Sequence, residues 1–161
     1  NLRREMPVEC QKEVTDRDIE ALVNHGDNQP EQTADMYRFD RFDVHAGNFS
    51  TPTSVVRLKK GDQTFEEVAL GDGPINASFE AINKIVNPPE HSFENFSIQS
   101  VSEGNDTLGD VLVTLKHNGK DFKGRGLSTD IIESSIMAYI NAINRLIACS
   151  RTEQDKGEGV L

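Results

Sequence analysis

The chain has 161 residues, of which 17 are Lys or Arg and 27 are Asp or Glu, giving a formal net charge of -10. This length suits one ordinary domain, and the acidic balance disfavours partners with phosphate backbones and anionic membranes. No apolar run approaches the roughly 20 residues of a membrane-spanning helix. We therefore expect a cytoplasmic protein with no nucleic-acid or membrane partner. Cys10 and Cys149 lie near opposite ends and indicate neither a disulfide framework nor a metal site.

The first element that the sequence predicts is a helix ending near residue 24. Thr15 is a good N-cap, and a short apolar stripe follows at helical spacing: Ile19, Leu22 and Val23. Residues rich in helix breakers come next, so we interpret 1–34 as a linker helix and a loop. A helix this short is marginal in water, and we expect it to dock on another part of a larger protein.

The region 35–150 repeats itself. Gly47-Asn48 matches Gly104-Asn105 at an offset of 57, and the match runs without gaps as far as residues 56–59 and 113–116. Further along, Gly71-Asp72-Gly73 matches Gly124-Arg125-Gly126, where the offset falls to 53. This fall predicts a shorter third strand in the second copy. We expect two units, at 35–87 and 92–148, followed by a frayed or disordered tail at 151–161.

Each unit is predicted to contain three strands and a helix. β-branched and alternating residues predict first-unit strands over 37–44, 53–59 and 64–70. A helix then opens with Pro74 at its first position and ends at Asn87-Pro88-Pro89.

The second unit has strands predicted over 94–102, 109–117 and 120–123, with Asn118-Gly119 as a hairpin turn. Ser128 is the expected N-cap of its helix. This helix has a long apolar stripe and, beside it, a face of small residues: Ser135, Ala138 and Ala142. Two non-charged faces would cover the unit's own sheet and either the sister helix or another subunit.

These elements predict an α+β fold. Two pseudo-symmetric βββα units would pack as one domain, with the helices covering the apolar faces of the sheets. A single unit exposes too much apolar sheet to be stable alone, and isologous dimerisation would extend the same pairing.

The sequence predicts no catalytic residue and no metal ligand. The histidines have no metal-ligand spacing, and they stand at positions 25, 45, 91 and 117. Neither a Gly-x-Ser-x-Gly elbow nor a phosphate-binding P-loop is present.

Two glycine segments are candidate ligand sites instead. Gly71-Asp72-Gly73-Pro74 and Gly124-Arg125-Gly126-Leu127-Ser128 each lead from a strand to a helix N-terminus. Free N–H groups and the helix dipole favour a carboxylate or phosphate at such a position. The alternative is a tight turn with ordinary capping.

These segments carry a family resemblance. Residues 71–77, 124–135 and 138–144 resemble the C-terminal regulatory domain of 2-isopropylmalate synthase. Residues 12–23 resemble the helix that joins the catalytic barrel of that family to its regulatory domain, and the resemblance as a whole covers 12–148.

The resemblance implies a regulatory piece without its enzyme. Family members condense acetyl-CoA with 2-oxoisovalerate in a metal-dependent (α/β)₈ barrel, and their regulatory domain dimerises and binds leucine for feedback inhibition. The barrel has no counterpart in this sequence, so we expect no cofactor and no synthase activity in this chain. The parent acyltransferase would use a divalent metal and acetyl-CoA. The implied partners are leucine or a similar branched-chain amino acid, a second copy of the chain and the catalytic barrel.

The resemblance also implies an effector site near the dimer interface. Carried over by position, its residues are Gly71, Gly73, Ile75 and Asn76 at the turn, and Phe93, Phe96, Ser100 and Thr107 on the strand side. The aromatic and aliphatic residues could enclose a branched side chain, the turn amides could bind a carboxylate, and the Asn76 oxygen could accept from an ammonium group. The alternative for Phe93 and Phe96 is plain sheet core.

Two other functions remain open at this point. The regulatory domain of citramalate synthase is similar and responds to isoleucine, which differs from leucine by one methyl position, a difference worth only about 1–3 kcal/mol. The other alternative is a dimerisation module that binds no ligand.

Overall fold

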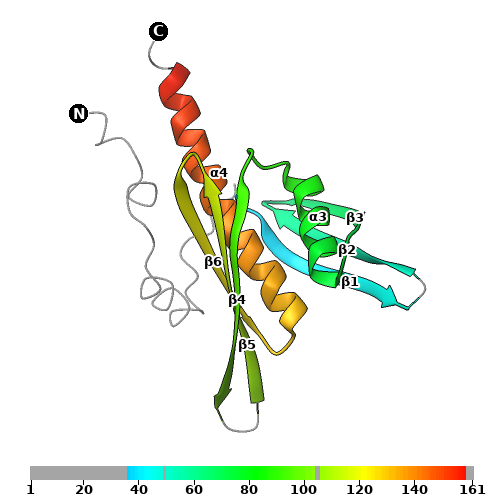
Figure 1. The fold of residues 1–161 in the computed structure, drawn as a ribbon. Coiled ribbons are helices and arrows are strands. Elements are labelled where there is room, and N and C mark those ends of the chain that lie inside the picture. The colour runs from blue at the N-terminus through cyan, green and yellow to red at the C-terminus, as the bar shows by residue number, and fades with distance from the viewer. Residues whose placement is uncertain (1–35, 49, 104–105, 159–161) are drawn as a thin grey trace.

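The computed structural model describes residues 36–48, 50–103 and 106–158. In these residues two antiparallel sheets are each followed by a helix (Figure 1). The elements in chain order are β1 (Arg38–Gly47), β2 (Ser50–Lys60), β3 (Gln63–Leu70), α3 (Pro74–Val86), β4 (Ser92–Glu103), β5 (Asp106–His117), β6 (Lys120–Ser128) and α4 (Ile131–Glu158). The predicted α+β fold of two βββα units is confirmed, whereas the linker helix predicted within 1–34 lies outside the described residues.

The central strands β2 and β5 supply the buried faces of the two sheets. Val56 and Leu58 of β2 are fully buried, as are Val113 and Leu115 of β5. These positions are related by the offset of 57, so the repeated sequence produces repeated burial. The predicted Asn118-Gly119 turn joins β5 to β6, and both of its residues have positive φ, as the tight hairpin requires.

The strand register corrects the predicted end of the repeat. Ser54 pairs with Ala69 in the first sheet and Val111 pairs with Gly126 in the second, so the offset of 57 continues through the third strand. The Gly-Arg-Gly segment therefore lies inside β6, whereas Gly71-Asp72-Gly73 follows β3. Matching the two segments was wrong, and β6, with 9 residues, is not shorter than β3, with 8.

The glycines of β6 allow α4 to lie against the strand backbone. A Cβ atom at Gly124 would overlap the carbonyl oxygen of Ala138, and one at Gly126 would overlap the carbonyl oxygen of Ser134. Ser134 and Ala138 are four residues apart and so share one face of the helix. For Gly124–Gly126, the hypothesis of an anion-binding turn and its alternative, a tight turn, were both wrong, because these glycines lie within β6 and serve helix packing.

The start and end of α4 differ from the prediction. Asp130, not Ser128, is the N-cap, because its carboxylate accepts the N–H groups of Ile132 at 2.8 Å and Glu133 at 3.3 Å. Ser128 ends β6, and its hydroxyl accepts the N–H of Asp130 at 3.2 Å. At the other end, residues 151–158 are helical, where a frayed tail was expected.

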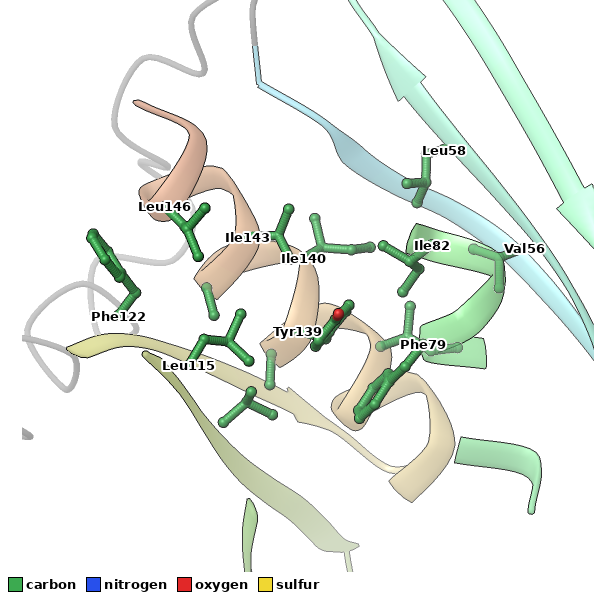
Figure 2. Close-up of a cluster of buried hydrophobic side chains, with 14 of the residues drawn as sticks. Val56, Leu58, Phe79, Ile82, Leu115, Phe122, Tyr139, Ile140, Ile143 and Leu146 are labelled. Carbon is green, nitrogen blue, oxygen red and sulfur yellow. The ribbon is translucent and has the colours of Figure 1, made fainter. Parts of the chain in front are cut away.

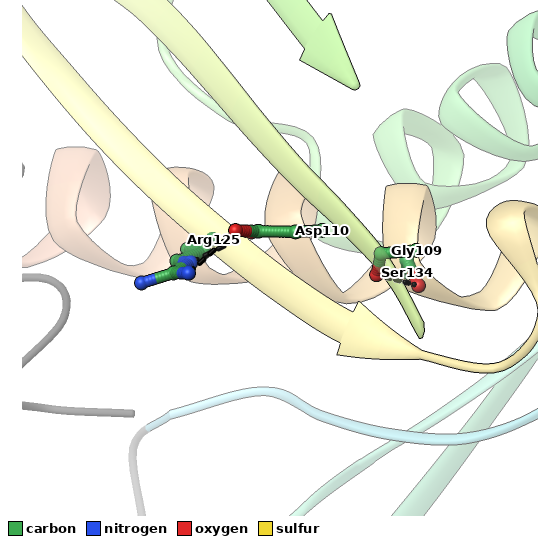
Figure 3. A network of polar contacts seen from close by, with 4 residues as sticks. All are labelled: Gly109, Asp110, Arg125 and Ser134. Atoms are coloured by element: carbon green, nitrogen blue, oxygen red, sulfur yellow. Dashed lines mark hydrogen bonds and ion pairs between the residues drawn. The ribbon is translucent and has the colours of Figure 1, made fainter. Parts of the chain in front are cut away.

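Polar contacts fix β5 to β6 and to α4 (Figure 3). Arg125 donates from Nε to Asp110 at 2.7 Å and makes a second, parallel bond to the same carboxylate. Such bidentate pairs are among the stronger polar contacts in proteins. The Ser134 hydroxyl donates to the Gly109 carbonyl at 2.9 Å, which holds the first turn of α4 on β5.

One hydrophobic core joins the two units (Figure 2). Val56, Leu58 and Ile82 of the first unit belong to the same buried cluster as Ile140 and Ile143 of α4. The units are therefore parts of one folded domain and not separate modules.

Helix α4 also holds the first strand of the other unit. The Asn144 side chain accepts the N–H of Tyr37 at 3.0 Å and donates to its carbonyl at 2.8 Å. Cys149, buried on the same helix, is disulfide-bonded, which the positions of the cysteines did not predict. No helix in the described part of the chain is long and apolar enough to span a membrane.

Candidate functional site

A cavity of about 560 Å³ opens where α3, α4 and the beginning of β4 meet. This volume lies within the roughly 300–1,000 Å³ typical of small-molecule pockets. The lining residues come from both units, and they are Ile75, Asn76, Phe79, Glu80, Asn83, His91, Phe93, Phe96 and Tyr139. We refer to this space as the α3–α4 cavity.

Aromatic rings form the apolar wall of the cavity. Phe79 stacks on Tyr139 with a centroid distance of 4.3 Å and an interplanar angle of 15°. Phe93 and Phe96 lie 5.7 and 6.4 Å from the Phe79 ring. Phe79 and Tyr139 are almost fully buried, whereas Phe93 is 46% exposed. Phe93 is thus a partly open rim residue and does not follow the alternative of plain sheet core.

Helix α3 presents two parallel rows of side chains to the cavity. Ile75 and Phe79, four residues apart, form an apolar row. Asn76, Glu80 and Asn83 form a polar row beside it. The cavity therefore has one apolar and one polar side, both presented by the first three turns of one helix.

The turn before α3 is held by its own hydrogen bonds. Gly71 donates its N–H to the Pro52 carbonyl at 3.1 Å, and the Asp72 N–H donates to Asn76 Oδ1 at 3.1 Å. A Cβ atom at Gly71 would overlap the backbone nitrogen of Ala77, so this position needs glycine for a close approach. Gly73 is the N-cap in extended backbone, and a Cβ there would meet no described atom within 4 Å.

A buried hydroxyl closes the floor of the cavity. Tyr139 donates to Asn83 Oδ1 at 2.6 Å, and His91 Nε2 lies 3.3 Å from the same hydroxyl oxygen. His91 Nδ1 lies 2.8 Å from the Pro89 carbonyl. Burial raises the pKa of Tyr139 to about 12, the hydrogen bond with Asn83 opposes this rise, and the negative charge of Glu80 adds to it. Tyr139 is consequently a neutral hydrogen-bond donor at physiological pH.

The structure brings together half of the residues that the sequence predicted for an effector site. Ile75, Asn76, Phe93 and Phe96 line the α3–α4 cavity, and Gly71 and Gly73 form the turn at its edge. Ser100 and Thr107 lie on the far part of the β4–β5 hairpin, where Ser100 pairs with Gly109 and Thr107 with Ser102. The side chains of these two residues lie outside what the structure describes.

Five lining residues were not in the predicted site. Phe79, Glu80 and Asn83 follow from helical spacing: Phe79 lies four residues after Ile75 and Glu80 four after Asn76, and Asn83 lies four residues after Phe79. No local signal places His91 and Tyr139 at the cavity, since the connection after α3 brings His91 there and the packing of α4 against α3 brings Tyr139. Among the described residues, no group of three or more His, Cys, Asp or Glu side chains could hold a metal ion.

Comparison with known proteins identifies the family. A family model described as the LeuA allosteric (dimerisation) domain matches residues 13–147. The chain belongs to this family. The resemblance that the glycine segments predicted is therefore confirmed, and the α3–α4 cavity is a feature of a LeuA-type domain.

Curated relatives of this LeuA-type domain are named 2-isopropylmalate synthase. One from a Nostoc species is 38% identical over 148 residues, which cover 91% of this chain and 27% of the relative. One from Ruminiclostridium cellulolyticum is 42% identical over 137 residues, covering 85% and 26%, and one from a Synechocystis species is 43% identical over 138 residues, covering 85% and 25%. The chain spans about a quarter of the length of these relatives.

Proposed function

We propose that this LeuA-type domain is the regulatory domain of a 2-isopropylmalate synthase and that it binds leucine in the α3–α4 cavity for feedback inhibition. The observation that carries the proposal is the cavity itself, because Ile75, Asn76, Phe93 and Phe96 were predicted as effector residues and all line it. The family description and the names of the relatives support the same role.

The chemistry of the cavity suits a branched-chain amino acid. The apolar row of Ile75 and Phe79, with Phe93 and Phe96 opposite, offers a surface on which burial of a leucine side chain contributes about 1.5–3 kcal/mol. The N-terminus of α3 lies at the edge of the cavity, and its backbone N–H groups and dipole favour a carboxylate. An amino acid would thus present its apolar and its charged parts to different walls.

The remaining features of the proposal concern the parent protein. The parent would condense acetyl-CoA with 2-oxoisovalerate in a separate, metal-dependent catalytic barrel, in the cytoplasm. The LeuA-type domain would form homodimers and act on that barrel. This chain alone is expected to show no acetyl-CoA-dependent turnover, and turnover by the pure chain would contradict the assignment of catalysis to the barrel.

Calorimetric titration of the 161-residue chain with leucine, isoleucine and valine tests the proposal. Leucine is expected to bind most tightly. Tighter binding of isoleucine would favour a citramalate synthase, and the absence of heat from a folded dimer with all three would favour a dimerisation module without a ligand.

A substitution in the apolar row tests the location. Ile75→Asp places a charge where the leucine side chain would lie, so it is expected to abolish binding while the chain remains dimeric in analytical ultracentrifugation. Val68→Asp is the matched control, because Val68 is 48% exposed on β3 and does not line the cavity. Unchanged leucine affinity in Ile75→Asp would count against the proposed cavity.

A further inference from the structure

The polar row of α3 contains one carboxylate, Glu80, and two amides that already have hydrogen-bond partners. Asn76 Oδ1 accepts the Asp72 N–H, and Asn83 Oδ1 accepts the Tyr139 hydroxyl. Glu80 stands between these two amides and lines the same cavity. Among the residues that the structure describes, the Glu80 carboxylate makes no hydrogen bond or ion pair, and the residue is exposed at the cavity.

The other ionisable residues of the cavity wall, His91 and Tyr139, are already hydrogen-bonded to protein atoms. Both ring nitrogens of His91 lie within hydrogen-bond distance of protein atoms, the Pro89 carbonyl and the Tyr139 hydroxyl. Tyr139 is 2% exposed and its hydroxyl points to Asn83. The charge of Glu80 is felt as far as this hydroxyl, since it contributes to the raised pKa of Tyr139. Glu80 is therefore the one carboxylate among the residues that line the cavity.

We propose that Glu80, and not Asn76, binds the ammonium group of the amino-acid effector. The assignment rests on the proposed function and deepens it. A carboxylate makes a charge-assisted hydrogen bond to an ammonium group, which is stronger than the bond that a neutral amide offers. The Glu80 carboxylate would also make the cavity selective for amino acids over 2-oxo acids. A 2-oxo acid with the carbon skeleton of leucine has no ammonium group to pair with Glu80.

The assignment is tested with leucine and 4-methyl-2-oxopentanoate on three forms of the full chain: the wild type, Glu80→Gln and Glu67→Gln. Glu67→Gln is the matched control, since it removes the same charge from an exposed position on β3 that does not line the cavity. We expect Glu80→Gln to weaken leucine binding by about ten- to a hundredfold, as is typical for loss of a hydrogen bond between charged groups. The control is expected to bind leucine like the wild type.

The oxo acid supplies a second measurement, the preference of each form for leucine over the oxo acid. The wild type is expected to bind it more weakly than leucine by a similar factor, and Glu80→Gln is expected to lose most of this preference. Leucine binding that is equally tight in Glu80→Gln and the wild type would overturn the assignment and leave the proposed function intact. If the wild type binds none of the three branched-chain amino acids, the proposed function fails and the assignment falls with it.

Discussion

Alanine at Gly126 tests whether close packing of α4 on β6 stabilises the domain. The new Cβ would overlap the Ser134 carbonyl oxygen and lie 2.8 Å from the Ala138 backbone nitrogen, whereas ordinary contacts begin at 3.4 Å. Both obstructing atoms belong to the helix backbone, so no side-chain rotation relieves the overlap. The helix must move away from the strand, by at least the difference between these two distances.

The loss of stability expected in Gly126→Ala depends on the side chains that α4 buries. Displacing a packed surface by 0.5–1 Å forfeits about a quarter to a half of the dispersion energy of each contact. Ile136, Ile143 and Leu146 on α4 are all essentially fully buried, so the whole interface with the sheet is affected. We expect a loss of about 3 kcal/mol in the free energy of unfolding, the upper end of the usual cost of overpacking. This loss corresponds to a fall of roughly 10 °C in Tm.

Urea and thermal unfolding followed by circular dichroism measure this effect. Gly73→Ala is the matched control, because Gly73 has an extended backbone and a Cβ there meets no described atom within 4 Å. The control is expected to change the free energy of unfolding by less than about 1 kcal/mol. Equal stabilities of the two variants would refute the reasoning.

Three further predictions concern contacts between the units. Tyr139→Phe keeps the ring stacked on Phe79 but removes the donor to Asn83, so unfolding by urea should show a loss of about 1–2 kcal/mol. Because the pKa of Tyr139 is raised from 10.0 to about 12, the folded state holds the phenol proton more tightly than the unfolded state. The contribution of the protonated Tyr139 to the free energy of unfolding is therefore fully present below pH 10. It falls by about 3 kcal/mol between pH 10 and about 12. The free energy of unfolding of Tyr139→Phe, measured against pH, should lack this decline. Asn144→Ala leaves the backbone N–H and carbonyl of Tyr37 without their side-chain partner, and a loss of about 1–3 kcal/mol is expected in the same urea assay; no loss would show that water replaces the amide.

The order of the elements could be predicted because it depends on local patterns. Pro74 at the first helical position and Asn87-Pro88-Pro89 after the last one predicted α3 with the bounds that the structure has, Pro74–Val86. The repeat predicted that Val56 and Val113 are equivalent, and both are fully buried on central strands. Short-range sterics and alternation of apolar residues determine such features, and both are visible in the sequence.

The role of the second glycine segment could not be predicted in the same way. Gly124-Arg125-Gly126 has the composition of a turn, and the similar segment Gly71-Asp72-Gly73 does precede a helix. In the folded domain the segment is strand, because the small face of α4 needs two positions in β6 without a Cβ atom. The distance between two backbones is a tertiary property, and one glycine pattern serves either purpose.

By itself, the sequence determined the α+β class, the two βββα units, the family and four of the nine residues that line the α3–α4 cavity. Only the tertiary structure decided that Phe79 of α3 and Tyr139 of α4 stack on each other and line a cavity. The reason is that the two rings stack across the junction of the units, and helical periodicity shows which face of a helix is buried but not which residue of another element meets it. The position of Glu80 at that cavity, on which the proposed recognition of an ammonium group depends, follows from the same packing.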